Sequence, residues 1–352
     1  MWRDRHARRI ADNDAMNLKM PLRPLACATA ALLLAACAST PSAPAPKPSF
    51  PAQLPPPKIG LALGGGAAKG FAHIGVIKML EANGIRVDVV SGTSAGSVVG
   101  ALYASGMTPY QLQTQAFALD ESKIRDVSLF SGGLVKGQKL QDYVNQLLDN
   151  RPMQSFPKPF AAVATQLDTG RRTAFVRGNA GQAVRASSSI PGVFEPVPIG
   201  KTRYVDGGVV SPVPVDAARE LGADFVIAVD ISSKAGGNKP GSMVGIVNQS
   251  ITIMGQKLGE LELARADVVL RPRVGQIGAA DFEQKNVAIL EGEKAAQAAM
   301  PQIKAKLAAL QRERAAAWAK KNAPRPRPKC EPGLLDKLGR WVGREGSCAA
   351  TD

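Results

Sequence analysis

The sequence predicts an α/β fold built around a mostly parallel sheet. Residues 59–63 are an apolar run bounded by glycine, residues 64–70 form a Gly/Ala loop, and residues 71–83 have helical periodicity. The same order of strand, turn and helix follows at once over residues 87–105. Two such units in a row need a helical crossover between neighbouring strands, and such a crossover makes the strands parallel.

The second unit consists of a buried strand at residues 87–91, a sharp turn at residues 92–96 and a helix of small residues at 97–105. Further strands are expected at residues 160–165, 173–176, 225–230 and 267–270. Helical patterns alternate with them at residues 137–148, 215–221 and 244–263. The α/β domain is therefore predicted to cover about residues 58–300.

The first 36 residues have the pattern of a secretory signal. Their apolar run, residues 25–36, is too short to cross a bilayer, which takes about 20 apolar residues. The run ends in Leu34-Ala35-Ala36-Cys37, which resembles the bacterial lipobox. That resemblance implies a lipoprotein-type signal peptide over residues 1–36 and diacylglycerol on Cys37; an ordinary signal followed by a chance cysteine is the alternative.

Residues 37–57 are predicted to be a tether behind the lipidated cysteine. Eight prolines lie within residues 41–57, a composition that favours extended chain and cannot build a packed core. Such a segment could reach roughly 60 Å at about 3.1 Å per residue. Because Ala38 and Ser39 lack the aspartate that often keeps bacterial lipoproteins in the inner membrane, we expect the outer membrane, facing the periplasm.

The formal charge of the chain is +15, and much of it belongs to a basic tail at residues 301–352. Residues 312–344 hold ten Lys/Arg against three Asp/Glu. The tail has no nucleic-acid-binding motif, and its aromatic residues are limited to Trp318 and Trp341, so no nucleic-acid partner is expected. Anionic phospholipid headgroups would attract such a cluster; a solvated face is the equally open alternative.

Within this end of the chain, residues 292–321 indicate one or two helices, and residues 333–342 a short amphipathic helix that could pack on the domain or on a membrane. Cys330 and Cys348 also lie here. They could form a disulfide or stay as two thiols, because the sequence does not give the Cα separation that a disulfide demands. The sequence does not indicate an oligomeric state.

The segment Gly92-Thr93-Ser94-Ala95-Gly96 fits the G-x-S-x-G nucleophile elbow. In that motif Gly92 and Gly96 would allow a strained turn from strand to helix, which exposes the serine Oγ. The expected strand before Ser94 and helix after it support this interpretation, and the helix N-terminus places positive partial charge beside the hydroxyl. The alternative is a tight turn whose serine only caps a helix.

A serine nucleophile needs a base, and the chain has two histidines. His6 lies in the predicted signal and His73 on the first helix, where a packing role is favoured. If histidine is excluded, the base must be a carboxylate, and Asp206 of Tyr204-Val205-Asp206-Gly207-Gly208 is then the most constrained candidate. A plain Asp-Gly-Gly turn is the alternative, and Asp224 and Asp230 are weaker candidates because they lack the glycines.

The loop Gly64-Gly65-Gly66-Ala67-Ala68-Lys69-Gly70 follows a strand and opens a helix, so its amides could bind an anion. It lacks the G-x-G-x-x-G spacing and the Gly-Lys-Ser/Thr of nucleotide-binding loops. The other possible anion is the oxyanion of an acyl-transfer intermediate, for which one donor is typically worth about 10²–10³ in rate. The neighbouring serine turn favours the oxyanion.

Taken in order, the motifs at residues 64–70, 92–96 and 206–208 resemble those of the patatin-like phospholipase family, in its bacterial lipoprotein branch. The resemblance includes residues 72–76 and 188–194 and fades after Met254. It implies a three-layer α/β/α fold and a Ser-Asp dyad that needs no histidine.

In this dyad the resemblance makes Ser94 the acylated nucleophile and Asp206 its base. The glycine loop becomes the oxyanion hole, with Gly65 and Gly66 as donors and Lys69 adding charge. Gly207 and Gly208 complete the aspartate motif.

Two positions depart from the family pattern. Ala67 stands where many relatives have glycine, and Ser211 where an asparagine is frequent. A side chain at position 67 favours negative φ, which is why Gly65 and Gly66 are the named donors.

The predicted function is a serine acyl-ester hydrolase of the phospholipase or lipase type, acting on phospholipid or another acyl ester. No cofactor is expected, and no acidic cluster indicates a metal site. An acyltransferase or thioesterase that uses the same acyl-enzyme is the first alternative. A non-catalytic, lipid-binding envelope protein is the second.

Overall fold

The computed structural model describes residues 54–120, 122, 124, 126, 135–234 and 240–323. The predicted signal peptide, Cys37, most of the tether, Cys330 and Cys348 lie outside these residues, as does the amphipathic segment at 333–342.

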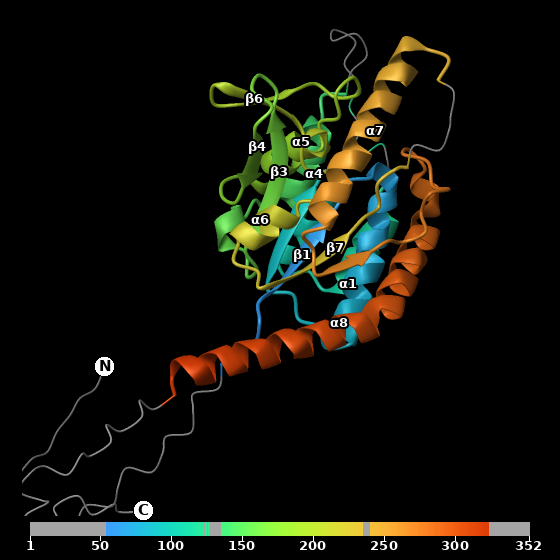
Figure 1. Cartoon of the computed structure of the whole chain (residues 1–352). Helices are drawn as coiled ribbons and strands as arrows, with labels where there is room; N and C mark the ends of the chain where they lie inside the picture. The colour runs from blue at the N-terminus through green and yellow to red at the C-terminus, as the bar shows by residue number, and fades with distance from the viewer. Residues whose placement is uncertain are drawn as a thin grey trace, which may run out of the picture. The chain divides into compact units, whose positions relative to one another are not determined.

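An eight-stranded sheet forms the centre of the described domain (Figure 1). Its strands are β1 (Ile59–Leu63), β2 (Val89–Thr93), β3 (Phe160–Gln166), β4 (Arg172–Phe175), β5 (Val197–Ile199), β6 (Thr202–Asp206), β7 (Phe225–Val229) and β8 (Val268–Leu270). They follow the order β5-β6-β3-β2-β1-β7-β8, and β4 also pairs with β3. The run from β3 through β2, β1 and β7 to β8 is parallel, whereas β4, β5 and β6 pair antiparallel.

The helices are α1 (Ala72–Ala82), α2 (Ala95–Ala104), α3 (Pro109–Ala118), α4 (Gln138–Leu147), α5 (Ala180–Ser187), α6 (Val215–Glu220), α7 (Met243–Leu263) and α8 (Lys285–Lys321). Short 3-10 turns are η1 (Ala67–Phe71), η3 (Met153–Ser155), η4 (Gly207–Val209) and η5 (Phe282–Gln284).

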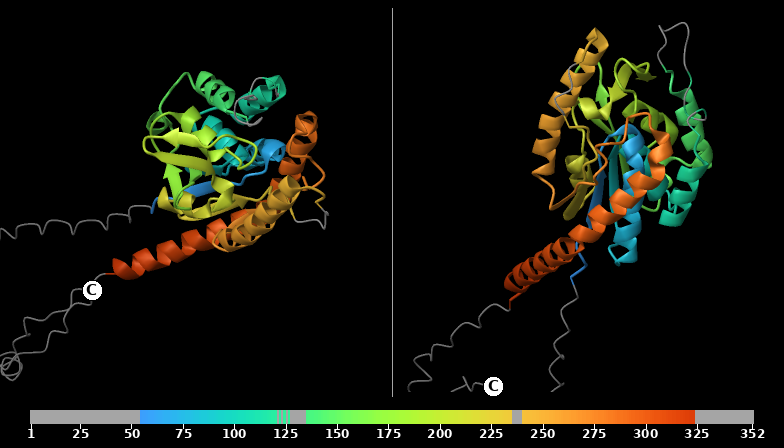
Figure 2. Two further views of the ribbon diagram at one scale, coloured as in Figure 1. Left: turned by 90° about the horizontal axis from the view of Figure 1, so that it is seen from above. Right: turned by 90° about the vertical axis from the view of Figure 1, so that its right-hand side faces the viewer.

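The two faces of the sheet carry separate apolar layers because side chains alternate along each strand. On one face Leu61 and Leu63 of β1 join a cluster formed with α1, α2 and α8. On the other face Ala62 lies in a cluster with residues of α6 and with Leu263 at the end of α7. Figure 2 shows α7 on one side of the strands and α1 with α8 on the other. The predicted three-layer α/β/α fold is confirmed.

The expected strands and helices occur close to their predicted positions, and β1 matches its range. Helices α3 and α5 and strand β5 were not predicted from the sequence. The predicted one or two C-terminal helices are a single helix, α8, which begins earlier and continues through Pro301. Since Ile303 is fully buried, the core extends beyond the predicted boundary at residue 300.

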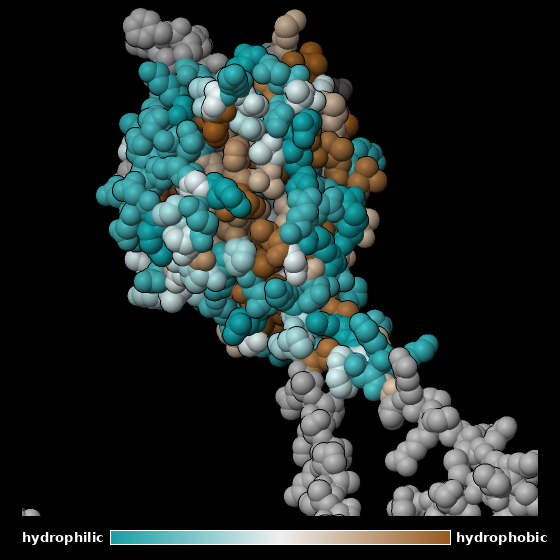
Figure 3. Space-filling model, turned by 90° about the vertical axis from the view of Figure 1, so that its left-hand side faces the viewer, coloured by the Kyte–Doolittle hydropathy of each residue, from teal (hydrophilic) through white to brown (hydrophobic). Residues whose placement is uncertain are grey.

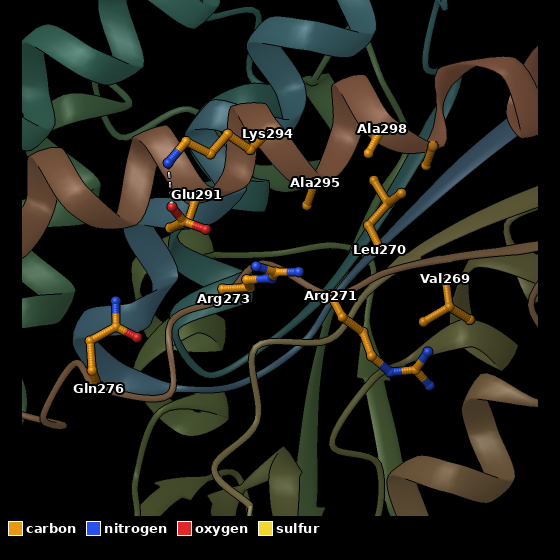
Figure 4. A pocket seen from close by; sticks show the side chains of 10 residues that line it. Val269, Leu270, Arg271, Arg273, Gln276, Glu291, Lys294, Ala295 and Ala298 are labelled. Atoms are coloured by element: carbon orange, nitrogen blue, oxygen red, sulfur yellow. Dashed lines mark hydrogen bonds and ion pairs between the residues drawn. The ribbon is translucent and has the colours of Figure 1, made fainter.

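A cavity of about 730 Å³ opens between β8 and α8 (Figure 4). Arg271, Arg273 and Lys294 are among the residues that line it, and Lys294 is paired with Glu291. None of its lining residues belongs to the serine, aspartate or glycine-loop motifs.

The side of the domain that carries β4 and β6 is shown in Figure 3. Hydrophobic side chains reach the surface in the middle of this face, and hydrophilic side chains surround them. Across the described residues, no helix combines the length and the apolar character needed to span a bilayer.

Candidate active site

Ser94 occupies a strained turn between β2 and α2. Its backbone has φ +53° and ψ −124°, a combination that a residue with a side chain rarely adopts. The turn also needs its glycines: a Cβ on Gly92 would lie 2.3 Å from the carbonyl oxygen of Gly96, and one on Gly96 would lie 2.1 Å from that of Leu63. These glycines let α2 start directly behind the serine, as a nucleophile elbow requires.

Hydrogen bonds on both sides fix the backbone of Ser94. Its N–H donates to Ser187 Oγ at 2.9 Å, and Ser187 Oγ in turn donates to the carbonyl oxygen of Val163. The carbonyl oxygen of Ser94 accepts from the hydroxyl of Ser97 at 2.7 Å. The Ser94 N–H is therefore occupied, and the side chain is buried with 6% exposure.

Asp206 ends β6, which runs antiparallel to β3, and its carboxylate faces Ser94. The carboxylate accepts hydrogen bonds from the Ser94 side chain and from the Gly208 N–H, the latter at 2.7 Å. Gly207 has to be glycine, because a Cβ there would lie 2.2 Å from the Val163 carbonyl oxygen. Burial raises the pKa of Asp206 to about 6, although both hydrogen bonds act to lower it.

The glycine loop differs in detail from the sequence prediction. The N–H of Gly65 donates to the Pro212 carbonyl oxygen at 3.0 Å, so Gly65 has no free donor for an oxyanion. Within the part of the chain that the structure describes, the amides of Gly66 and Ala67 have no acceptor. Ala67 adopts φ +50°, so the backbone tolerates strain here and does not adopt the negative φ that a side chain favours.

The Lys69 side chain contacts the segment that follows β7. Its amino group donates to Ser233 Oγ at 2.7 Å, and the residue is 5% exposed. Burial lowers the pKa of Lys69, against the attraction of nearby Asp230. A role for Lys69 at the oxyanion stays a prediction.

His73 supports the base of the glycine loop. Its Nε2 lies 2.8 Å from the Gly64 carbonyl oxygen, and the ring is fully buried. Burial lowers the pKa of His73 to about 4, so the ring is neutral and donates through Nε2. This geometry agrees with the packing role that the sequence favoured.

Glu262 of α7 holds the loop after Asp206, and sequence reasoning did not single it out. Ser211 Oγ donates to one of its carboxylate oxygens at 2.5 Å, and the Val213 N–H donates to the other at 2.8 Å. Burial raises the pKa of Glu262 to about 7. No motif marks this glutamate, because only the tertiary packing of α7 brings it to the loop.

The two weaker aspartate candidates are engaged elsewhere. Asp224 accepts from the Lys58 N–H at 2.8 Å and pairs with Arg314 at 3.2 Å. Burial would raise the pKa of Asp230, but hydrogen bonds from Ser232 and the charge of Lys234 outweigh it, and the net pKa is lowered. Over the described residues, no three His, Cys, Asp or Glu side chains converge where they could hold a metal ion.

Comparison with known proteins adds a family match over the same motifs. Residues 61–219 match the model described as patatin-like phospholipase. An uncharacterized NTE family protein of Mycobacterium tuberculosis is 34% identical over 184 residues, which are 51% of this chain and 51% of that protein. The chain thus spans about half the length of the mycobacterial relatives it matches.

Two further matches come from other organisms. The lysophospholipase NTE1 of Pyricularia oryzae is 33% identical over 181 residues, covering 50% of this chain and 12% of that protein. The crystal structure of VipD from Legionella pneumophila superposes with a TM-score of 0.50 at 14% identity, covering 71% of this chain and 68% of VipD. The likeness to VipD concerns the fold alone.

Proposed function

We propose that the chain is a patatin-like serine acyl-ester hydrolase with Ser94 as nucleophile and Asp206 as base; the match of residues 61–219 to the patatin-like phospholipase model supports this proposal. One observation carries the proposal. A serine at positive φ, directly before a helix, shares a hydrogen bond with a buried aspartate whose pKa is raised to about 6. Such an aspartate is ionised at neutral pH and basic enough to take a hydroxyl proton in the transition state.

In the acylation step, Ser94 Oγ attacks the acyl carbonyl carbon while its proton passes to the Asp206 carboxylate. The tetrahedral intermediate then collapses, the ester C–O bond breaks, and the leaving alkoxide takes the proton from Asp206. In the second half-reaction Asp206 takes a proton from water, whose oxygen attacks the acyl-enzyme. Collapse releases the fatty acid and returns the proton to Ser94.

We assign the oxyanion hole to the amides of Gly66 and Ala67, in place of the predicted Gly65. Both N–H groups lack an acceptor in the described chain, and the Gly65 backbone packs against Ser94: a Cβ on Gly65 would lie 3.3 Å from the Ser94 Cβ. The positive φ of Ala67 supports this role, because strained backbone persists where surrounding structure enforces it, often at catalytic sites. The N-terminus of α2 adds positive potential.

The acceptor that completes the reaction defines the alternative function. An alcohol that attacks the same acyl-enzyme would make the protein an acyltransferase. A thioester that forms the acyl-enzyme would make it a thioesterase. Product analysis of one acyl ester, in water and with added glycerol, separates the two: free fatty acid supports the hydrolase, and predominant glycerol ester supports the transferase.

We also propose the membrane attachment that the sequence indicates. Lipidation of Cys37 behind a signal peptide would tether the domain to the outer membrane on its periplasmic side, close to phospholipid. Mass spectrometry of the mature N-terminus and membrane fractionation test this, with Cys37→Ser as the control that should be neither acylated nor retained. A mature N-terminus other than acylated Cys37 would contradict it.

The nucleophile is tested with a fluorophosphonate probe, which labels activated serines. Wild type should be labelled and Ser94→Ala should not, while Ser105→Ala, a buried serine on the far end of α2, should label like wild type. Labelling that persists in Ser94→Ala would defeat the assignment. A wild type that is not labelled and turns over no ester would favour the non-catalytic alternative.

A further inference from the structure

Helix α7 concentrates exposed apolar side chains to a degree that no other described element matches. Thirteen large hydrophobic side chains are exposed in the described part of the chain, and six of them lie on α7. They are Met243, Ile246, Val247, Ile253, Met254 and Leu261, with Met243 82% and Met254 57% exposed.

These side chains form a stripe and are not scattered. At 100° per residue, Met243, Val247, Met254 and Leu261 fall within a narrow sector of the helix, and Ile246 and Ile253 lie at its border. The helix lies at the outside of the molecule in both views of the ribbon (Figures 1 and 2). The N-terminus of α7 is capped within the chain, because Ser242 Oγ accepts from the Gly245 N–H at 3.1 Å.

The opposite side of α7 packs on the loop that carries the aspartate of the dyad. A Cβ on Gly255 would lie 3.8 Å from the Gly208 carbonyl oxygen, and one on Gly259 would lie 3.5 Å from Pro212. Glu262 accepts hydrogen bonds from the same loop. The exposed stripe is therefore only one helix thickness away from the Asp206–Gly208 motif.

The chemistry of this surface selects its partner. Residues 240–256 contain no charged and no aromatic residue, and the first charges on either side are the lysines Lys239 and Lys257. Protein interfaces favour aromatic residues and arginine, whereas an aliphatic stripe bordered by lysine suits an anionic lipid surface, where lysine stems extend to the headgroups. The Lys257 side chain is 75% exposed, and its amino group also pairs with Glu260 at 3.3 Å.

We propose that α7 is a lipid-docking helix, whose stripe enters the headgroup and acyl boundary of a bilayer containing anionic phospholipid. This surface would bring membrane phospholipid to the site through the loop that α7 covers. The statement that this phospholipid is a substrate rests on the proposed function. The docking itself does not require catalysis.

The test uses the full chain with Cys37→Ser and Ser94→Ala, so that neither an acyl anchor nor hydrolysis contributes to binding. Met243→Gln, Val247→Gln and Met254→Gln are combined, because glutamine keeps helix propensity and removes the apolar contact. The matched control combines Tyr110→Gln, Leu167→Gln and Leu290→Gln, which are exposed apolar positions outside α7.

Flotation with vesicles of phosphatidylcholine and phosphatidylglycerol should show a loss of affinity of about tenfold or more for the α7 variant and none for the control. Binding of the parent should weaken on vesicles of phosphatidylcholine alone. With Ser94 intact, the Cys37→Ser chain that carries the three α7 substitutions should hydrolyse vesicle phospholipid more slowly than the Cys37→Ser chain without them, but both should turn over a water-soluble short-chain ester at the same rate.

Vesicle binding by the α7 variant equal to that of the parent would overturn the proposal. A parent that is dimeric by light scattering, with an α7 variant that is monomeric and still binds vesicles, would assign the stripe to a second copy of the chain. If no ester is hydrolysed while the binding difference persists, the proposed function fails and the lipid-docking role stands.

Discussion

Two residues of the site, Ser94 and Ala67, have positive φ although neither is glycine. One carries the proposed nucleophile, and the other contributes an amide without an acceptor in the glycine loop. A left-handed backbone costs a residue with a Cβ roughly 1–2 kcal/mol, so both are held by the packing around them. The strain lies where the proposed chemistry needs it.

Replacing Ala67 with glycine should relieve one of these strains. We expect Ala67→Gly to change the free energy of unfolding by between zero and about +1 kcal/mol, since the relief of strain competes with the greater freedom of glycine in the unfolded chain. Ester turnover should stay near wild type because the backbone N–H remains. Ala67→Val should destabilise, and urea unfolding of the three proteins measures both effects. A more stable valine variant would contradict the reasoning.

The raised pKa of Asp206 predicts the pH dependence of turnover. As a base Asp206 must be ionised, so kcat/KM for a soluble ester should rise with pH through an apparent pKa of about 6. Asp206→Asn should lose about 10²–10⁴-fold in rate and lose this limb of the profile. Asp224→Asn is the control and should keep the wild-type rate and this limb of the pH profile. An unchanged limb in Asp206→Asn would assign the pKa to another group.

At the scale of elements, α1 and α8 pack so closely that their backbones touch. A Cβ on Gly75 of α1 would lie 1.9 Å from the Ile289 carbonyl oxygen, and one on Gly292 of α8 would lie 2.0 Å from that of Ala72. Only glycine permits this approach. The contact fixes the first helix, which carries His73 beneath the glycine loop.

Gly75→Ala should therefore force the two helices apart. Overpacking of this kind typically costs 1–3 kcal/mol and occasionally more, and we expect about 3 kcal/mol because the clash is with backbone. Gly241→Ala is the matched control, since a Cβ there meets nothing within 4 Å. Thermal and urea unfolding measure both. A Gly75→Ala protein as stable as the control would show that the crossing is not close.

Glu262 connects α7 to the loop behind Asp206, and its removal should affect the site. Glu262→Ala leaves the Ser211 hydroxyl and the Val213 N–H without an acceptor, which should cost about 1–3 kcal/mol. Pro212 lies between Ser211 and Val213 in the loop, and its carbonyl oxygen accepts from the Gly65 N–H. We therefore expect kcat to fall more than KM changes. Glu262→Gln keeps a carbonyl acceptor and should recover part of both losses.

Glu260→Ala on the exposed side of the same helix provides the comparison for Glu262. It should leave kcat unchanged. If Glu262→Ala lowers stability but leaves kcat and KM at their wild-type values, the loop does not depend on this contact for its position.

For the whole molecule, two buried carboxyl groups determine a dependence of stability on pH. The folded-state pKa values of Asp206 and Glu262 are raised to about 6 and about 7. The folded state therefore binds these protons more tightly than the unfolded chain does. Their contribution to stability is fully present below about pH 4 and is lost as pH rises through 6 and 7.

The free energy of unfolding should accordingly fall between about pH 4 and 7, by on the order of 2–3 kcal/mol for each group. Asp206→Asn combined with Glu262→Gln should flatten this dependence and be the more stable protein at pH 8. Urea unfolding across this pH range tests it. A wild type that gains stability as pH rises through 6 and 7 would contradict the raised pKa values.

The fold could be predicted from sequence because its signals are local. The apolar run of β1 is continuous, as is typical of a parallel strand buried on both faces, and the glycine-rich turns at residues 64–70 and 92–96 separate strands from helices. The elements that were not named, β5 among them, have weak patterns. A three-residue strand such as β5 is defined by its pairing with β6 and not by its own sequence.

The candidate site could be predicted in part for the same reason. Ser94 and Asp206 lie in motifs whose glycines are required by close backbone approach, and this requirement is visible in the sequence. The choice of oxyanion donor was not visible. Whether the Gly65 amide is free depends on Pro212, which lies 147 residues away in the chain and reaches the loop only in the folded protein.

The sequence by itself determined the strand-turn-helix order, the serine turn and the lack of a usable histidine, because each depends on neighbouring residues. Only the tertiary structure decided that Gly66 and Ala67 hold the free amides, that Glu262 supports the aspartate loop and that α7 exposes an apolar stripe. These properties arise from contacts between distant segments. No local pattern encodes which donor is already bonded or which helix face is left uncovered.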